Sequence, residues 1–213
     1  MKQTLFIAKL FVLTLIAGLS YAAGPFQEGQ HYTRLGDPVR TANPNKVEVV
    51  EVFSYDCPHC FAFEPLVQPW QQKLSPDVVF ISMQAIWDSN REKLARAQLT
   101  ARALKVADKI HPALYNAIQV QGKRVLNEKQ IKEIFVSNGV DGLKFEKTFS
   151  SFGINSQIDQ NRAKLNGYKV NSTPQLIIDG TYVITPTQEI DHLVMLEIAD
   201  FLIAKVRAER GFE

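Results

Sequence analysis

The stretch VEVVEVFSYDCPHCFAFEP, residues 47–65, contains the strongest strand pattern in the sequence, both cysteines and the start of a helix. Apolar residues alternate onto both faces of an extended chain over residues 47–54, so they predict a central strand covered on both sides. The motif CPHC at residues 57–60 then opens a helix, since Pro58 suits the first helical position. We expect this helix to run to about Lys73.

Cys57 and Cys60 are the chemically decisive pair. Two intervening residues allow a disulfide across the first helical turn. Cys57 lies where free backbone N–H groups and the helix dipole favour an anion, so its thiolate is expected to be stabilised and its pKa lowered. A stabilised thiolate favours the reduced form and makes the disulfide a better oxidant. Cys57 is therefore predicted to be the sulfur that is attacked, and Cys60 the buried resolving sulfur.

Other uses of this pair fit the sequence less well. As a structural disulfide it closes only a four-residue loop, and chain entropy gives about 2 kcal/mol for such a loop against about 3 kcal/mol for fifteen residues. A zinc site needs four ligands, and the four histidines show no ligand spacing around the two cysteines. We therefore predict redox chemistry, with no metal and no cofactor.

Two side chains near the motif are expected to support it. His59, if protonated, would lower the pKa of Cys57 further; the alternative is a plain exposed histidine. Glu51 alternates onto an apolar face of the predicted strand, where burial would raise its pKa and make it a proton acceptor. The alternative for Glu51 is a strand twist that brings it to solvent.

The sequence outside the motif predicts an α/β domain interrupted by a helical insertion. Residues 23–87 read as strand–helix–strand, residues 88–166 are helical in pattern, and residues 167–213 read as hairpin–helix. Ser89 is expected to cap the first helix of the insertion. The last helix is expected to begin at Thr185-Pro186.

The first 22 residues have the layout of a cleaved signal peptide: a short basic start, an apolar core and small residues at the cleavage site. The uninterrupted apolar run is shorter than a spanning helix needs. Without Lys2 and Lys9 the 24 basic residues fall to 22, equal to the 22 acidic ones. No basic surface is then left to argue for nucleic acid.

The Thr173-Pro174 pair precedes a short apolar strand. Proline cannot donate to a sheet ladder, so Pro174 belongs at the start of that strand. The Thr173-Pro174 bond could be cis at modest cost, or be an ordinary trans bond in a loop.

The segment Val49–Cys60 resembles the active-site region of DsbA-type oxidoreductases of the thioredoxin superfamily. The resemblance covers essentially the whole chain after the leader. It extends to the following residues: Gly29, Tyr32, Pro38, Phe61, Phe63, Glu64, Thr173 and Pro174.

This resemblance implies a thioredoxin fold with an inserted all-helical domain. It implies a cis bond before Pro174, with Thr173 and Pro174 placed against Cys57 to bind substrate. It also implies that Glu51 lies beneath the disulfide and helps to move protons. The expected activity is that of a protein disulfide oxidoreductase: a monomer in the periplasm donates its disulfide to newly exported proteins through a mixed disulfide at Cys57. A quinone-linked membrane oxidase of the DsbB type would recharge it.

Two departures from the family pattern make the oxidising strength an open question. Thr173 stands where well-known members carry Val, and a Thr is found there in related isomerases. Asp56 precedes Cys57 where an aromatic is common, and its negative charge would oppose the thiolate.

Two other functions remain as alternatives. The first is a disulfide isomerase or reductase, but such exported relatives usually carry an N-terminal dimerisation domain, for which residues 23–56 leave no room. The second is a chaperone-like peptide-binding module, in which the two cysteines would have no purpose.

Overall fold

Five strands form one mixed sheet, in the order β1-β5-β4-β2-β3. The computed structural model describes residues 24–123 and 127–212, so the leader predicted at residues 1–22 lies outside the described part. The strand bounds are β1 Thr33–Arg34, β2 Val47–Phe53, β3 Val78–Gln84, β4 Gln175–Ile178 and β5 Tyr182–Ile184.

Strand β2 is the centre of this sheet, as its two-sided apolar pattern predicts. It runs parallel to β3 and antiparallel to β4, and every one of its residues is buried. Strand β3 pairs with β2 alone and lies at the edge, so its first five residues are only partly buried.

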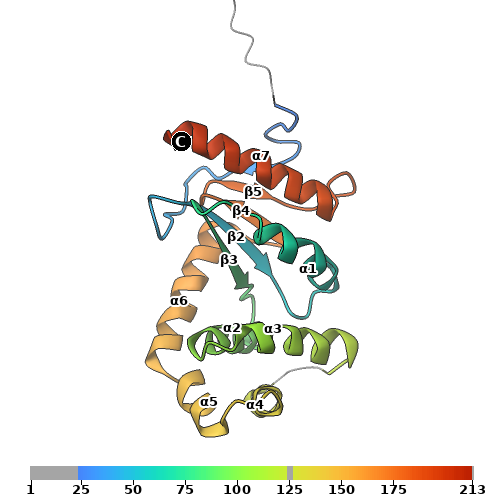
Figure 1. Cartoon of the computed structure of the whole chain (residues 1–213), viewed down its shortest axis with the longest axis vertical. Coiled ribbons are helices and arrows are strands. Elements are labelled where there is room, and N and C mark those ends of the chain that lie inside the picture. Colours follow the sequence, from blue (N-terminus) through green and yellow to red (C-terminus); the bar gives the residue numbers. More distant parts are fainter. Residues whose placement is uncertain (1–23, 124–126, 213) are drawn as a thin grey trace, which may run out of the picture.

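Helices cover both faces of the sheet and also form a separate block (Figure 1). Helices α1 and α7 pack on the face that carries Val47 and Val49, and the end of α6 packs on the face that carries Val50 and Val52. The helix bounds are α1 Pro58–Gln71, α2 Ser89–Ala103, α3 Ala107–Tyr115, η1 Asn116–Val120 (a π-helix), α4 Glu128–Ser137, α5 Gly142–Phe149, α6 Phe152–Gly167 and α7 His192–Arg210.

The helical block lies between β3 and β4 in the chain and has a core of its own. Helices α2 to α5 enclose apolar side chains that include Ile110, Phe135 and Phe145. Phe53 and Cys60 reach into this core from the sheet and from α1. The block therefore closes over the buried side of the CPHC motif.

Two helix starts differ from the expected ones. The cap of α2 is Asp88, not Ser89, and its carboxylate accepts hydrogen bonds from Asn90 N and Arg91 N. Helix α7 begins at His192, not at Thr185-Pro186. The Thr187 hydroxyl accepts from Glu189 N and Ile190 N, which makes a turn of the segment expected to be helical. Asp191 caps α7 instead.

Within residues 24–123 and 127–212, no helix combines the length and apolar character needed to span a membrane.

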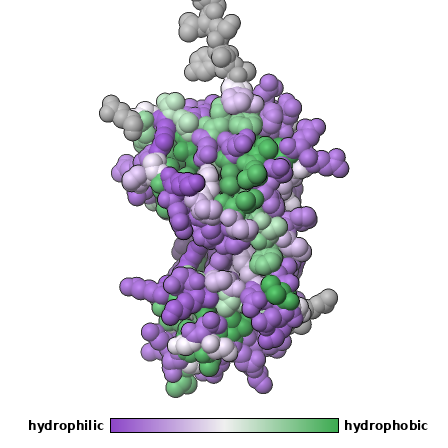
Figure 2. Space-filling view, turned by 45° about the vertical axis from the view of Figure 1, so that its right-hand side comes forward, coloured by the Kyte–Doolittle hydropathy of each residue, from purple (hydrophilic) through white to green (hydrophobic). Residues whose placement is uncertain are grey.

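On the face shown in Figure 2, hydrophobic surface gathers on the upper lobe and continues towards the waist of the molecule.

Candidate active site at the start of helix α1

Cys57 caps helix α1 directly after the loop that follows β2. Its backbone is extended, with φ −94° and ψ 115°, and Pro58 occupies the first helical position. The Cys60 backbone N–H donates to Cys57 Sγ over 3.4 Å, so the sulfur takes the place of an ordinary capping oxygen. The strand–turn–helix context predicted for the motif is present.

The surroundings of Cys57 favour its thiolate. The half-buried sulfur has its pKa lowered to about 5, chiefly by a hydrogen bond from the Cys60 side chain. Partial burial opposes this shift, while the Thr173 side chain and the backbone N–H groups of Cys60 and His59 add to it. The two backbone donors belong to the helix start, where the dipole also favours an anion.

Cys60 has the opposite environment. Its side chain has no exposed surface and belongs to the core of the helical block. Its bond to Cys57 and its burial raise the pKa of Cys60, so it stays a thiol while Cys57 is a thiolate. Ser54 N donates to Cys60 Sγ over 3.4 Å, which fixes the sulfur beside the end of β2.

The Thr173-Pro174 bond is cis, as the resemblance implies, and the pair lies against the motif. Cys57 Sγ is 3.4 Å from the Thr173 carbonyl oxygen, to which a thiol donates. A hollow of about 420 Å³ lies beside this contact. Its lining comes from α1, from the cis-proline loop, from the segment before α7 and from the first residue of α7: His59, Thr173, Pro186, Thr187, Ile190, Asp191 and His192.

His59 is exposed at the edge of this hollow. It contributes to the lowered pKa of Cys57 through its backbone N–H, so a cationic role for its imidazole stays a prediction. His192 was not singled out from the sequence. Burial and the neighbouring His59 lower the pKa of His192, and its ring packs 5.0 Å from that of Phe63.

Glu51 points inward from β2, as the alternation predicts. It lies opposite Leu176 and Ser82, only 2% of its surface is exposed, and Oε1 has no hydrogen-bond partner. Burial, and next the nearby Glu64 carboxylate, raise the pKa of Glu51 to about 8, against smaller opposing effects of Ser82 and Arg102. Glu51 is therefore protonated at neutral pH.

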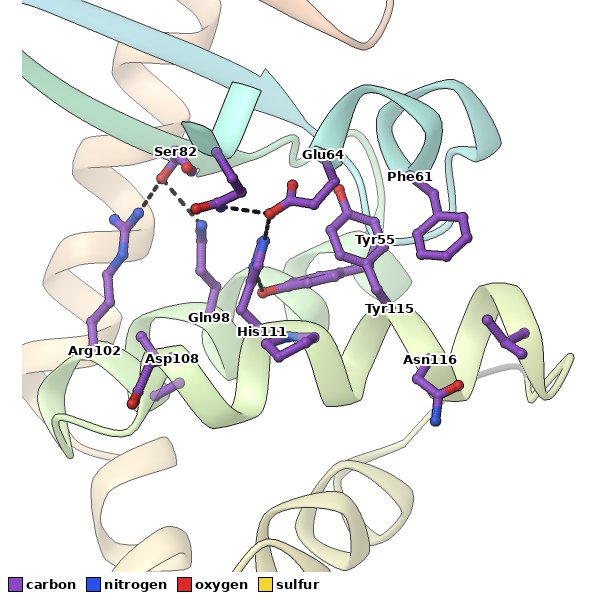
Figure 3. Close-up of a pocket in the computed structure, with 15 residues that line it drawn as sticks. Tyr55, Phe61, Glu64, Ser82, Gln98, Arg102, Asp108, His111, Tyr115 and Asn116 are labelled. Carbon is purple, nitrogen blue, oxygen red and sulfur yellow. Dashed lines mark hydrogen bonds and ion pairs between the residues drawn. The ribbon is translucent and has the colours of Figure 1, made fainter. Parts of the chain in front are cut away.

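A cavity of about 660 Å³ opens between α1 and the helical block beside this core (Figure 3). A chain of hydrogen bonds crosses it: Tyr55 OH lies 2.8 Å from His111 Nδ1, and His111 Nε2 lies 2.9 Å from Glu64 Oε1. Burial raises the pKa of Tyr55, which stays protonated. These hydrogen bonds could not be predicted from the sequence, because His111 comes from α3, far from the motif along the chain.

Asp56, which interrupts the usual pattern before Cys57, has partners of its own. Its Oδ2 lies 2.9 Å from Arg91 Nη2, and Ser54 Oγ donates to its Oδ1. Among the described residues, no cluster of three or more potential metal ligands occurs.

The chain is similar along nearly its whole length to known proteins. A family model described as Thioredoxin matches residues 36–196. The thiol:disulfide interchange protein DsbA of Pseudomonas syringae pv. tomato is 34% identical over 208 residues, covering 98% of this chain and 97% of that protein. DsbA of Pseudomonas aeruginosa is 31% identical over 206 residues, covering 97% and 98%.

Solved structures have the same architecture. The crystal structure of Pseudomonas aeruginosa DsbA matches with a TM-score of 0.85 and 32% identity, over 89% of this chain and 98% of that one. The oxidoreductase DsbA from Xylella fastidiosa matches with a TM-score of 0.79 and 29% identity, over 85% and 98%. The predicted α/β class, a thioredoxin fold with a helical insertion, is confirmed.

Proposed function

Since this chain belongs to the DsbA family of thiol:disulfide interchange proteins, we propose that it oxidises cysteine pairs of other proteins with its Cys57–Cys60 disulfide. An oxidoreductase of this kind needs one sulfur that leaves readily and one that stays protected. The observation that carries the proposal is the contrast between the half-buried Cys57, with its lowered pKa, and the fully buried Cys60.

The reaction takes place in two exchanges. A substrate thiolate attacks Cys57 Sγ, a substrate–Cys57 disulfide forms, and Cys60 leaves with the electron pair. The second substrate thiolate then attacks the substrate sulfur of this mixed disulfide, and Cys57 leaves as a thiolate. The substrate gains a disulfide and loses two electrons, while the protein becomes a dithiol.

Glu51 is the proposed proton donor for Cys60. Because its pKa is raised to about 8, it holds a proton at neutral pH, and its unpartnered Oε1 is free for exchange. When Cys60 leaves as a thiolate in a buried site, protonation removes an unfavourable charge. In the reverse direction the Glu51 carboxylate takes the proton back.

Thr173 and Pro174 are the proposed substrate-binding residues, with His59 at the rim. The contact of the Thr173 carbonyl with the Cys57 sulfur, next to the hollow of about 420 Å³, supports this assignment. Backbone groups at this position can pair with an extended peptide without reading its sequence. Substrates of many sequences are then accepted.

The remaining parts of the proposal follow from family membership. We propose export by a leader at residues 1–22 and a domain of residues 23–87 and 167–213 interrupted by a helical insertion at 88–166. We propose action as a monomer in the periplasm, on reduced exported proteins, with reoxidation by a DsbB-type quinone-linked membrane oxidase. No nucleic acid, metal or cofactor enters the proposed reaction.

Trapping tests this function directly. Oxidised protein should transfer one disulfide per molecule to a reduced peptide with two cysteines. Cys60→Ser, activated as a disulfide with a small aromatic thiol, should accumulate a mixed disulfide through Cys57 with a peptide that has a single cysteine, whereas Cys57→Ser should not. Efficient repair of a protein with scrambled disulfides, with little net oxidation, would point to an isomerase instead. Trapping through residue 60 would contradict the assignment of Cys57.

A further inference from the structure

A residue with a negatively charged side chain directly precedes Cys57, the sulfur that the substrate is proposed to attack. Asp56 is exposed and precedes Cys57 in the chain, so its carboxylate opposes the formation of a thiolate on Cys57. The pKa of Cys57 is nevertheless lowered to about 5. The hydrogen bonds to Cys57 produce this lowering, and a cation paired with Asp56 would keep the Asp56 charge from opposing them.

Arg91 is placed to offset this charge. Its Nη2 lies 2.9 Å from Asp56 Oδ2, and about a third of each side chain is exposed. Arg91 comes from the first turn of α2, 35 residues after Asp56 in the numbering, so the contact depends on the fold and not on the local chain.

The Arg91 side chain is held in place from two further directions. Asp88, the cap of α2, accepts from Arg91 N over 2.9 Å, and its Oδ2 lies 2.5 Å from Arg91 Nη1. The guanidinium also lies over the Trp87 ring, 5.3 Å from its centroid. A guanidinium fixed in this way loses less freedom on pairing than a free one does.

Asp56 is held as well. Ser54 Oγ donates to Asp56 Oδ1, and the fully buried Gln84 donates to Ser54 Oγ from Nε2 over 2.7 Å. Gln84 Oε1 accepts from Tyr55 N over 3.0 Å. The three residues before Cys57 are therefore fixed by the end of β3, with the Asp56 carboxylate turned towards α2.

We propose that Arg91 is a positioning residue for the thiol–disulfide reaction, which cancels the charge of Asp56 beside the Cys57 thiolate and so keeps the disulfide oxidising. This inference rests on the proposed function of Cys57. Other groups also face Cys57: Cys60 and His59 from α1, Thr173 from the cis-proline loop and His192 from α7. None of these four supplies a carboxylate, so Asp56 is the acid next to Cys57 that Arg91 pairs with, while its other partner, Asp88, caps α2.

The test is a double-mutant cycle read at the Cys57 sulfur. Thiolate absorbance at 240 nm is titrated in the reduced full chain, and the equilibrium with glutathione is measured at pH 7. Arg91→Gln should lower the acid dissociation constant of Cys57, and with it the equilibrium constant for oxidising glutathione, about twofold to fivefold, the size of a partly exposed charge interaction. Arg91→Lys should restore most of the loss.

The decisive comparison is Arg91→Gln in an Asp56→Asn background. In this background residue 56 is neutral, so Arg91→Gln no longer leaves an uncompensated carboxylate beside Cys57. The change should then no longer weaken the disulfide as an oxidant. Arg96→Gln is the matched control, because Arg96 lies on the same helix and pairs with Glu92 away from Cys57. It should leave both readings unchanged.

The outcomes separate this inference from the proposed function. If the unmutated protein titrates in the acidic range and Arg91→Gln changes nothing, the inference is wrong and the function stands. An equal effect of Arg91→Gln with and without Asp56 would also overturn it, because Arg91 would then act on Cys57 directly or through the fold. If the unmutated protein shows no acidic thiol, the proposed function itself fails.

Discussion

The two cysteines at the ends of the first turn of α1 have different surroundings. The outer end holds Cys57, half-buried, with backbone N–H groups, the Thr173 side chain and a fixed Arg91–Asp56 pair around it. The inner end holds Cys60 without exposed surface, and the proposed proton donor Glu51, whose pKa burial raises, is buried as well. The outer end stabilises charge, and the inner end excludes it.

This difference explains how one short motif can release a thiolate and still retain a proton nearby. A polar rim favours an anionic leaving group, and an apolar interior keeps Glu51 protonated for use as an acid. The structure separates the two environments with a single turn of helix. Substitutions and changes of pH can alter one environment and leave the other as an internal reference.

The largest expected effect concerns the stability cost of Glu51. The pKa of Glu51 is about 8 in the folded protein and lower in the unfolded chain. Its contribution to the free energy of unfolding is therefore complete below about pH 4 and is lost as the pH rises through 8. Glu51→Gln keeps the shape of the protonated acid and removes this loss. The variant should match the unmutated protein at pH 4 and exceed its free energy of unfolding by about 4 kcal/mol at pH 8, in denaturant melts.

Glu48 provides the control on the same strand. It is buried as well, but its Oε1 lies 3.0 Å from Lys164 Nζ and its Oε2 accepts from Ala42 N. Glu48→Gln should therefore destabilise the protein, since it leaves Lys164 without its charged partner. A stability gain in both variants, or in neither, would contradict the interpretation of Glu51 as an unpaired buried acid on β2.

A second prediction compares the reduced and oxidised forms. The depressed pKa of Cys57 stabilises only the reduced protein; this contribution is present above the unfolded thiol pKa and is lost as the pH falls through about 5. Between pH 7 and pH 4, the stability of the reduced form should fall by about 2 kcal/mol relative to the oxidised form, a figure reduced for the exposure of Cys57. Parallel melts of both forms measure this. A stability difference between the two forms that does not change with pH would contradict a stabilised thiolate at Cys57.

A smaller effect is expected from Glu64, whose carboxylate is the second cause of the raised pKa of Glu51. Glu64→Gln should lower the pKa of Glu51 by about one unit, because it removes a like charge. Carbon-13 NMR of labelled glutamate carboxyls follows this, with Glu51→Gln to assign the signal. Glu92→Gln, which changes an acid paired with Arg96 and Arg162, is the control and should leave Glu51 unshifted.

The sequence predicted the parts of this site that depend on local order. The motif follows a covered strand and starts a helix, so the different environments of Cys57 and Cys60 could be predicted from position alone. The inward direction of Glu51 followed from the alternation of β2, which the structure confirms. Within a strand or at the start of a helix, the spacing of residues determines where each side chain points. Where a side chain points determines whether it is buried or exposed.

Contacts between distant segments could not be derived in this way. Arg91 and His111 come from α2 and α3, and nothing in their local sequence shows which side chain they meet. The start of α7 was misplaced because Thr185-Pro186-Thr187 has the composition of a helix start. The Thr187 hydroxyl instead closes a turn, and Asp191 satisfies the first N–H groups of α7. Competing capping residues a few positions apart are decided by packing.

The most direct test of the central contrast is the absorbance of the reduced protein at 240 nm, followed from pH 3 to pH 10. The account predicts one thiolate that forms near pH 5 and disappears in Cys57→Ser, while Cys60 remains a thiol throughout this range. A single transition near the free-thiol value of about 8.5 would contradict it. So would an acidic transition that persists in Cys57→Ser, because the stabilised thiolate would then belong to the inner end.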